Sequence, residues 1–352
     1  MHPESTQVFD VAIVGGGPAG LTASIWLARY LHTVVVVDSG DPRNWETRGV
    51  NGYLGLPGIK PADLRGRGRD EARADGVELV DAECVRATKH GADDFELCLS
   101  AGEKIHAKRL LLAIGLRDVW PDLPGISNVY GANAHVCPDC DGRECVDKKV
   151  VVIGKGRKAV GMALNLTTWT RDIIICTNGA PADFDRDEYC RKLDALNIPM
   201  IESAIKCVQH RGSNVTSIEF EGGMQLDVDK LFFAIGQYPS DDLGSQLGCE
   251  RDSGGHILVD KGYHTSVPNC FAAGDIIPGA QLAIAAAGDG AIAALFIHKT
   301  LVPEGRQLKP LPPIPVSGNG QEPLTAVESS DPADLASVEP EKSCATSKEC
   351  VT

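Results

Sequence analysis

Two glycine-rich turns, each placed between a β-branched run and a helical stretch, constrain the fold of this chain most. The first turn, GGGPAG, follows residues 11–14 and precedes a helical stretch at 19–30 and a second β-branched run at 34–37. The second turn, GKGRKA, follows residues 150–153 and precedes a helical stretch and the run 173–175. A strand, a helix and another strand in this order normally join two parallel strands. The sequence therefore predicts an α/β fold with two related units.

The ends of the two units are also alike. Residues 110–115 read LLLAIG and residues 231–236 read LFFAIG, so each unit closes with a buried strand that runs into a glycine. Further along, residues 254–259 and 270–275 predict strands, and the alanine-rich segment 281–299 predicts a helix. We therefore expect two Rossmann-like dinucleotide-binding domains, the second inserted into the first. The expected boundaries are residues 1–117 with 243–302 for the first domain, and residues 118–242 for the second.

The last fifty residues differ in composition from the rest. Residues 303–352 are rich in proline, contain no aromatic side chain and carry more acidic than basic groups. Such a segment buries too little apolar surface to offset the entropy of ordering it. We expect a flexible, acidic tail. Cys344 and Cys350 in this tail are interpreted as incidental thiols.

Charge and cysteine content narrow the classes of partner. The net charge of −14 argues against nucleic acid and anionic membranes. The first ten residues lack the basic and apolar segments of a signal peptide, and the longest apolar runs are too short to span a bilayer. Twelve cysteines without such a signal predict a reducing compartment, and hence the cytoplasm.

The first glycine turn has the full pattern of a dinucleotide-binding loop. Gly15 permits a tight turn, Gly17 lets the backbone approach a pyrophosphate, and Gly20 allows the helix to pack closely on the strand. Asp38, at the end of the next strand, can accept hydrogen bonds from a ribose. Pro18 and Ala19 complete the loop. A glycine turn used only for packing is the alternative interpretation.

A second motif, Cys137-Pro138-Asp139-Cys140, carries chemistry of a different kind. Two cysteines at this spacing can close a disulfide, and a thiolate of low pKa would be nucleophilic. Asp141 follows directly and could act as the acid or base that handles thiol protons. Half of a zinc site and a pair of inert thiols are the alternatives. A zinc site would need a second pair of ligands at the usual spacing, which the sequence lacks, so we predict no metal.

The order of these motifs resembles that of the low-molecular-weight thioredoxin reductases, among the flavoproteins with two dinucleotide domains. The resemblance runs from about residue 9 to residue 301. It rests on GGGPAG, AIG at 113–115, CPDCDG at 137–142, GxGxxA at 154–159, AIG followed by Pro239, AAGD at 272–275 and AIAAAGDGAIAA at 283–294.

The resemblance implies a role for each matching residue. Cys140 would exchange electrons with the flavin, Cys137 would attack a substrate disulfide, and Asp141 would be the acid–base group. FAD would bind the first domain, NADPH the second, and the chain would form a homodimer that acts on a thioredoxin-like protein or a small dithiol. The other implied cofactor-binding residues are Gly115, Gly274, Asp275 and Ala283 for FAD, and Gly154, Gly156 and Ala159 for the nicotinamide nucleotide.

The sequence departs from this family mainly in the second domain. Where the family carries a His-Arg-Arg cluster that grips the 2′-phosphate of NADPH, this chain has Cys176-Thr177-Asn178. No acidic residue stands there for the ribose of NADH either, which puts use of NAD(P)H in question. Near the flavin, Gln281-Leu282 replaces an Arg-Gln pair.

Three functions stay open from the sequence. The first is an NAD(P)H-driven disulfide reductase that acts on a thioredoxin-like protein. The second is a thiol oxidase or carrier-linked enzyme whose second domain lacks a working nicotinamide site. The third is a non-catalytic flavoprotein that serves as a redox sensor or scaffold. Outside the motifs, His135 is interpreted as an exposed loop residue, and Trp120 and Trp169 as packing residues.

Overall fold

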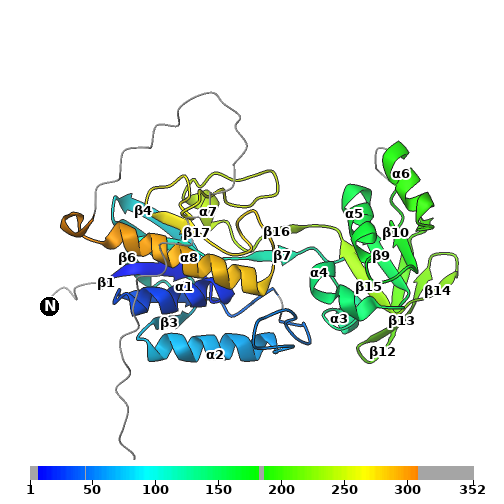
Figure 1. Ribbon diagram of the computed structural model, residues 1–352, viewed down its shortest axis with the longest axis horizontal. Helices are drawn as coiled ribbons and strands as arrows, with labels where there is room; N and C mark the ends of the chain where they lie inside the picture. The colour runs from blue at the N-terminus through cyan, green and yellow to red at the C-terminus, as the bar shows by residue number, and fades with distance from the viewer. Residues whose placement is uncertain (1–6, 44, 182–185, 308–352) are drawn as a thin grey trace, which may run out of the picture. The chain divides into compact units, whose positions relative to one another are not determined.

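The computed structural model describes residues 7–43, 45–181 and 186–307 (Figure 1). Its first sheet has seven strands in the order β3-β2-β1-β6-β5-β4, and β17 pairs with β6. Strands β3, β2, β1, β6 and β17 are parallel to their neighbours in this set, whereas β5 and β4 are antiparallel. The strands are β1 (Val8–Val14), β2 (Val34–Asp38), β3 (Glu78–Asp81), β4 (Cys84–Gly91), β5 (Asp94–Leu99), β6 (Lys104–Leu112) and β17 (Cys270–Ala272).

Side chains alternate between two apolar clusters on the faces of this sheet. Val11 and Ile13 of β1 are buried with α1 and α8, whereas Ala12 and Val14 are buried in the cluster on the other face. Helices α1 (Pro18–Arg29) and α8 (Ala283–Leu301) pack side by side, and α2 (Pro61–Ala74) lies beside α1 (Figure 1). The first and last helices of the described fold thus share one core.

The second sheet repeats the same plan. Its order is β11-β10-β9-β15-β8, with all printed pairings parallel. A separate antiparallel sheet, β12-β13-β14, buries one face in a core cluster that it shares with β9 and β15 of the second sheet. The elements are β8 (Ala134–His135), β9 (Val150–Gly154), β10 (Ile173–Cys176), β11 (Met200–Ile201), β12 (Ile205–Arg211), β13 (Asn214–Phe220), β14 (Gln225–Asp227), β15 (Lys230–Ala234), α5 (Gly156–Leu166) and α6 (Arg186–Ala195).

A two-stranded antiparallel ribbon carries the chain out of the first sheet and back. Strand β7 (Leu116–Asp118) follows β6, and β16 (Gln237–Pro239) follows β15 and pairs with it. The remaining elements are short: α3 (Ile126–Val129), α4 (Pro138–Asp141), α7 (Leu243–Gln246) and the 3-10 helices Gly142–Cys145 and Glu304–Arg306.

The predicted α/β class and the repeated strand–turn–helix openings are confirmed, as β1-α1-β2 and β9-α5-β10. The strand expected at residues 254–259 is wrong. Asp252 accepts hydrogen bonds from the backbone of Gly254 and His256, which folds this segment into a turn with a single bridge between Arg251 and Ile257. The tail from residue 308 onward, with Cys344 and Cys350, lies outside the described residues.

Helix α8 is the one described helix whose length and composition would allow it to cross a membrane. Its buried side includes Ala286, Ala293 and Ile297, which pack in the cluster shared with α1. The apolar character of α8 is therefore explained by its place in the core.

The contact between α1 and α8 depends on a glycine. A Cβ atom added at Gly290 would lie 2.1 Å from the carbonyl oxygen of Ala19, which is backbone and cannot rotate away. Gly288, on the exposed side of the same helix, has no atom within 4 Å of such a Cβ. The two glycines therefore form a matched pair for testing this contact.

We predict opposite effects of the same substitution at these two sites. Gly288→Ala should raise the free energy of unfolding by up to about 1 kcal/mol, because alanine favours the helix. Gly290→Ala should lower it by about 1–3 kcal/mol, because the added methyl forces the two helices apart. Urea unfolding followed by far-UV circular dichroism measures both. Equal effects would show that α1 and α8 do not make this close contact.

Candidate active site

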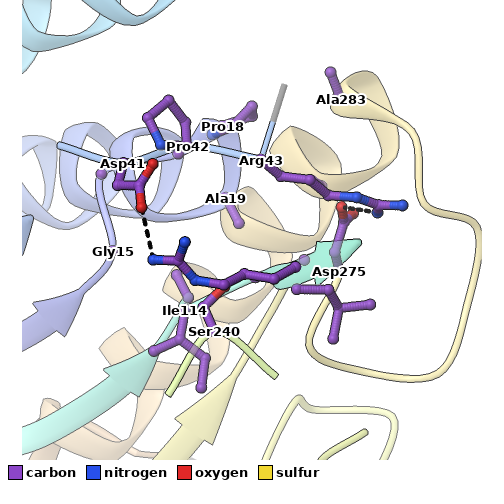
Figure 2. Close-up of a pocket in the computed structure, with 18 of the residues that line it drawn as sticks. Gly15, Pro18, Ala19, Asp41, Pro42, Arg43, Ile114, Ser240, Asp275 and Ala283 are labelled. Atoms are coloured by element: carbon purple, nitrogen blue, oxygen red, sulfur yellow. Dashed lines mark hydrogen bonds and ion pairs between the residues drawn. The ribbon is translucent and has the colours of Figure 1, made fainter. Parts of the chain in front are cut away.

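A cavity of about 530 Å³ opens where β1, β2 and β6 end (Figure 2). Ligands of parallel α/β sheets bind at this edge, and the volume falls within the range of about 300–1,000 Å³ usual for small-molecule sites. Its walls include both cysteines of the CPDC motif. The predicted residues that line it are Gly15, Gly17, Pro18, Ala19, Asp38, Gly115, Cys137, Cys140, Asp141, Gly274, Asp275 and Ala283.

The first glycine turn is held by backbone contacts. Gly15 has a φ of 108°, and a Cβ there would lie 2.2 Å from the carbonyl oxygen of Ala113. Gly20 does not line the cavity; its Cβ would lie 1.9 Å from the oxygen of Gly15. Gly17 has open space where a side chain would stand, and α1 begins after it with no side-chain cap. The first amide groups of α1 are therefore left available at the cavity wall.

Asp38 lies at the cavity but already has strong partners. Arg65 and Arg69 of α2 both form ion pairs with its Oδ2 atom, the second at 3.1 Å. Its Oδ1 atom accepts a hydrogen bond from the amide of Gly40 at 3.2 Å. Asp38 thus ties α2 to the end of β2, and a ribose there would share this carboxylate with two guanidinium groups.

Arg43 lies in none of the sequence motifs, yet its guanidinium contacts Asp118, Asp275 and Gln281. Its guanidinium makes two hydrogen bonds of 2.7 Å to Asp118 on β7. The Nη1 atom also donates to Asp275 at 3.1 Å (Figure 2). It donates to Gln281 at 2.9 Å as well. Arg43 thus brings a guanidinium to Gln281 from a loop 238 residues earlier in the chain.

Burial and ion pairing act against each other in this network. Burial alone would lower the pKa of Arg43. The hydrogen bonds and charge of Asp118, together with those of Asp275, outweigh this effect, so the pKa of Arg43 is raised. Burial raises the pKa of Asp275, while the charge of Arg43 opposes this. The site therefore holds Arg43 firmly charged.

The two cysteines of the CPDC motif form a disulfide, with their Cα atoms 5.3 Å apart. Cys137 caps the short helix α4, and its Sγ atom accepts a hydrogen bond from the amide of Cys140 at 3.1 Å. The side chain of Asn51 donates to the carbonyl oxygen of Cys140 at 3.0 Å. A Cβ at Gly142 would lie 2.5 Å from the ring of Trp169, so the glycine of CPDCDG lets this tryptophan cover the motif. Among the described residues, no group of three His, Cys, Asp or Glu side chains could hold a metal ion.

Asp141 and His135 form a pair behind the disulfide. Asp141 lines the cavity, and its Oδ2 atom lies 3.4 Å from Nδ1 of His135. The expectation that His135 is an exposed loop residue is wrong, because it lies on β8 and only 5% of it is exposed. A two-residue strand next to a cysteine motif gives no periodic signal from which burial could be predicted.

The second glycine turn lies outside this cavity. Gly156 has a φ of 63°, and a Cβ at Gly154 would lie 2.7 Å from the carbonyl oxygen of Ala234, while Ala159 is fully buried. Gly154, Gly156 and Ala159 thus pack the start of α5 on β9 and β15. Their role in binding a nucleotide stays a prediction.

Cys176, at the end of β10, and the two residues after it are buried or hydrogen-bonded to other parts of the chain. Cys176 is fully buried, and the hydroxyl of Thr177 donates to the carbonyl oxygen of Ala180. The side-chain oxygen of Asn178 accepts a hydrogen bond from the amide of Ile205 at 2.8 Å. None of the three presents a cationic group to a 2′-phosphate.

Comparison with known proteins identifies the family. The family model for pyridine nucleotide-disulphide oxidoreductases matches residues 9–290. The chain belongs to this family. It is 29% identical to thioredoxin reductase tcpT of Claviceps purpurea, over 77% of this chain and 87% of that protein.

Solved structures of the family have the same fold. A putative thioredoxin reductase TrxB from Bacillus anthracis is 30% identical, with a TM-score of 0.78 over 83% of this chain and 98% of that one. HlmI is 32% identical, with a TM-score of 0.80 over 84% and 94%. The chain is therefore a flavin-dependent disulfide oxidoreductase that resembles thioredoxin reductases, in a family whose members use a flavin and a nicotinamide nucleotide.

We predict that removing Arg43 destabilises the protein far more than removing a neighbouring surface arginine. Arg43→Ala should lower the free energy of unfolding by about 3 kcal/mol, because it leaves Asp118, whose side chain is 3% exposed, without its cation. The exposed pair between Arg117 and Asp41 is the control, and Arg117→Ala should cost about 0–1 kcal/mol. Urea unfolding measures both. Similar losses would mean that the Arg43 network does not hold the cavity together.

Proposed function

We propose that the chain is an FAD-dependent thiol–disulfide oxidoreductase in which the Cys137–Cys140 disulfide passes electrons between FAD and a dithiol or disulfide substrate. One observation carries the proposal: the disulfide and the first glycine turn line the same cavity. A dinucleotide bound at that turn would therefore extend toward the cysteines.

The residues of the cavity fit FAD. The open space at Gly17 and the uncapped start of α1 suit a pyrophosphate, which binds well at a helix N-terminus. Gly274, with a φ of 81°, brings the next turn against Ala19, so Asp275 can reach the ribityl region. Ala283 begins α8 and offers backbone to the ring system. When bound, FAD would accept or supply the pair of electrons that the disulfide exchanges.

The cysteines themselves carry out thiol–disulfide exchange. With a dithiol substrate, a substrate thiolate bonds to Sγ of Cys137, the bond between Cys137 and Cys140 breaks, and Cys140 leaves as a thiolate. The second substrate thiol then attacks the substrate sulfur of the mixed disulfide and releases Cys137. Asp141 takes the proton of that thiol and can return it to Cys137. The substrate loses two electrons, which reside on the two enzyme cysteines, and the reverse sequence reduces a disulfide.

Relatives named thioredoxin reductases support a thioredoxin-like protein as the partner. A small dithiol is the other substrate class that a disulfide at the cavity wall can accept. An electron partner other than NADPH is favoured by a specific observation: Thr177 and Asn178 are bonded within the fold where a phosphate-binding cluster would stand. A dithiol oxidase that passes electrons to oxygen or another acceptor is therefore the second candidate function.

The two cysteines should differ when changed one at a time. In Cys137→Ser, Cys140 remains as the thiolate next to the flavin, and we expect a long-wavelength charge-transfer band. In Cys140→Ser the band should be absent, because Cys137 faces the substrate. Absorption spectra of the purified variants measure this, and chromatography of the released flavin identifies FAD. Equal spectra, or FMN in place of FAD, would contradict the proposal.

NADPH should reduce the bound flavin slowly. Each charge-assisted hydrogen bond missing from the 2′-phosphate is worth about 1.5–3 kcal/mol, so the loss of two weakens binding by about a hundredfold or more. NADH should do no better, since Cys176, Thr177 and Asn178 offer its ribose no carboxylate. Anaerobic titration with each nucleotide, with flavin bleaching as the signal, measures this. Bleaching by dithiothreitol is the control for a competent flavin. Fast, saturable bleaching by micromolar NADPH would contradict this prediction and support an ordinary NADPH-dependent disulfide reductase instead.

A further inference from the structure

His135 has a polar atom that its surroundings leave without a partner. The side chain is 4% exposed, and its ring lies against Phe232, with centroids 5.4 Å apart. Its Nε2 atom is buried and makes no hydrogen bond within the described part of the chain. A buried polar group without a partner destabilises the folded state. Leucine would fill this place without that cost, so packing alone does not account for a histidine.

The other ring nitrogen has one partner, the carboxylate of Asp141. Nδ1 lies 3.4 Å from Oδ2, and the Asp141 side chain is 13% exposed. Within residues 7–43, 45–181 and 186–307, no other side chain of opposite charge lies within ion-pair distance of this carboxylate. Because Nε2 has no partner, the contact of Nδ1 with Asp141 is the polar side-chain contact that this ring makes within the described part of the chain.

Other charged groups near this pair are committed elsewhere. Lys230 of β15 forms an ion pair with Glu144 at 2.9 Å, and Asp139 accepts a hydrogen bond from Asn165. The Cys145 thiol lies 3.8 Å from the backbone oxygen of Asp141, and burial raises its pKa to about 11, so it stays neutral at ordinary pH. His135 is thus the group that can orient the Asp141 carboxylate.

We propose that His135 is a positioning residue for thiol–disulfide exchange, which holds the Asp141 carboxylate toward Cys137 and Cys140 through the contact between its Nδ1 atom and Oδ2 of Asp141. This inference rests on the acid–base role of Asp141 in the proposed function. Strand β8 supplies the rigidity, because its pairing with β15 places His135 opposite Phe232. His135, two residues before Cys137, thereby belongs to the reaction as well as to the sheet.

The test measures exchange at the cysteines without relying on the flavin. Oxidised full-length protein is mixed anaerobically with dithiothreitol, quenched with acid and alkylated, and mass spectrometry follows the release of Cys137 from its mixed disulfide with dithiothreitol, the step in which Asp141 acts. His135→Leu should slow this reaction about tenfold, part of the 10²–10⁴-fold that acid–base catalysis typically contributes. His135→Asn should retain most of the rate, because its amide nitrogen occupies the position of Nδ1. His135→Gln, whose amide nitrogen occupies the position of Nε2, should not.

A double-mutant cycle separates this inference from the function on which it rests. Asp141→Asn should be slow, and adding His135→Leu to it should change nothing further, because both remove the same interaction. Melting temperatures show whether each variant folds; if His135→Leu does not, the Asn and Gln variants still decide the question. Multiplied effects in the double variant, or equal rates for the Asn and Gln variants, would overturn the positioning role and leave the proposed function intact. A wild-type rate in Asp141→Asn would overturn the acid–base role of Asp141 and the positioning role with it.

Discussion

The cavity depends on how closely the backbone approaches the start of α1. Gly15 lies against the carbonyl of Ala113, Gly20 against that of Gly15, and Gly290 of α8 against that of Ala19. At each contact an added Cβ would stand within 2.2 Å of a backbone oxygen. Because a helix cannot bend locally to relieve such an overlap, any side chain here would shift α1 as a whole. Two glycines of the first glycine turn and one from α8 therefore fix where the first turn of α1 meets the cavity.

This dependence explains which features could be predicted from the sequence. Both strand–turn–helix units and the CPDC motif depend on local patterns, because glycine conformations and cysteine spacing are properties of a few consecutive residues. The ion pairs that shape the cavity are not local. Arg43 reaches Asp118 and Asp275, which are 75 and 232 residues away in the sequence, and nothing near Arg43 indicates either partner. The burial of His135 was missed for the same reason, since β8 is defined only by its pairing with β15.

The Arg43 network also connects the two segments on which the proposed chemistry depends. Asp118 lies on β7, which leads toward the CPDC motif, and Asp275 follows β17 in the first sheet. Arg43 binds both, and Gln237 of β16 adds hydrogen bonds to Asp118 at 3.1 Å and Gln281 at 2.9 Å. Each strand of the β7–β16 ribbon is thus tied to the loop before α8. The guanidinium of Arg43 and the amides of Gln237 and Gln281 therefore hold β7 and β16, the two strands through which the chain leaves the first sheet and returns to it.

The second glycine turn shows that a dinucleotide fingerprint has two separable parts. Its packing part is intact, because Gly154 still has to accommodate Ala234 for β9, α5 and β15 to pack together. Its ligand-binding part lies elsewhere, after β10, where Thr177 is bonded to Ala180 of its own loop and Asn178 to Ile205 of β12. The fold needs the glycine whether or not a nucleotide binds, whereas phosphate-binding arginines serve only the ligand and can be lost without destabilising the sheet. A glycine motif therefore indicates the fold of such a domain. Which nucleotide the domain binds has to be inferred from the residues after its second strand.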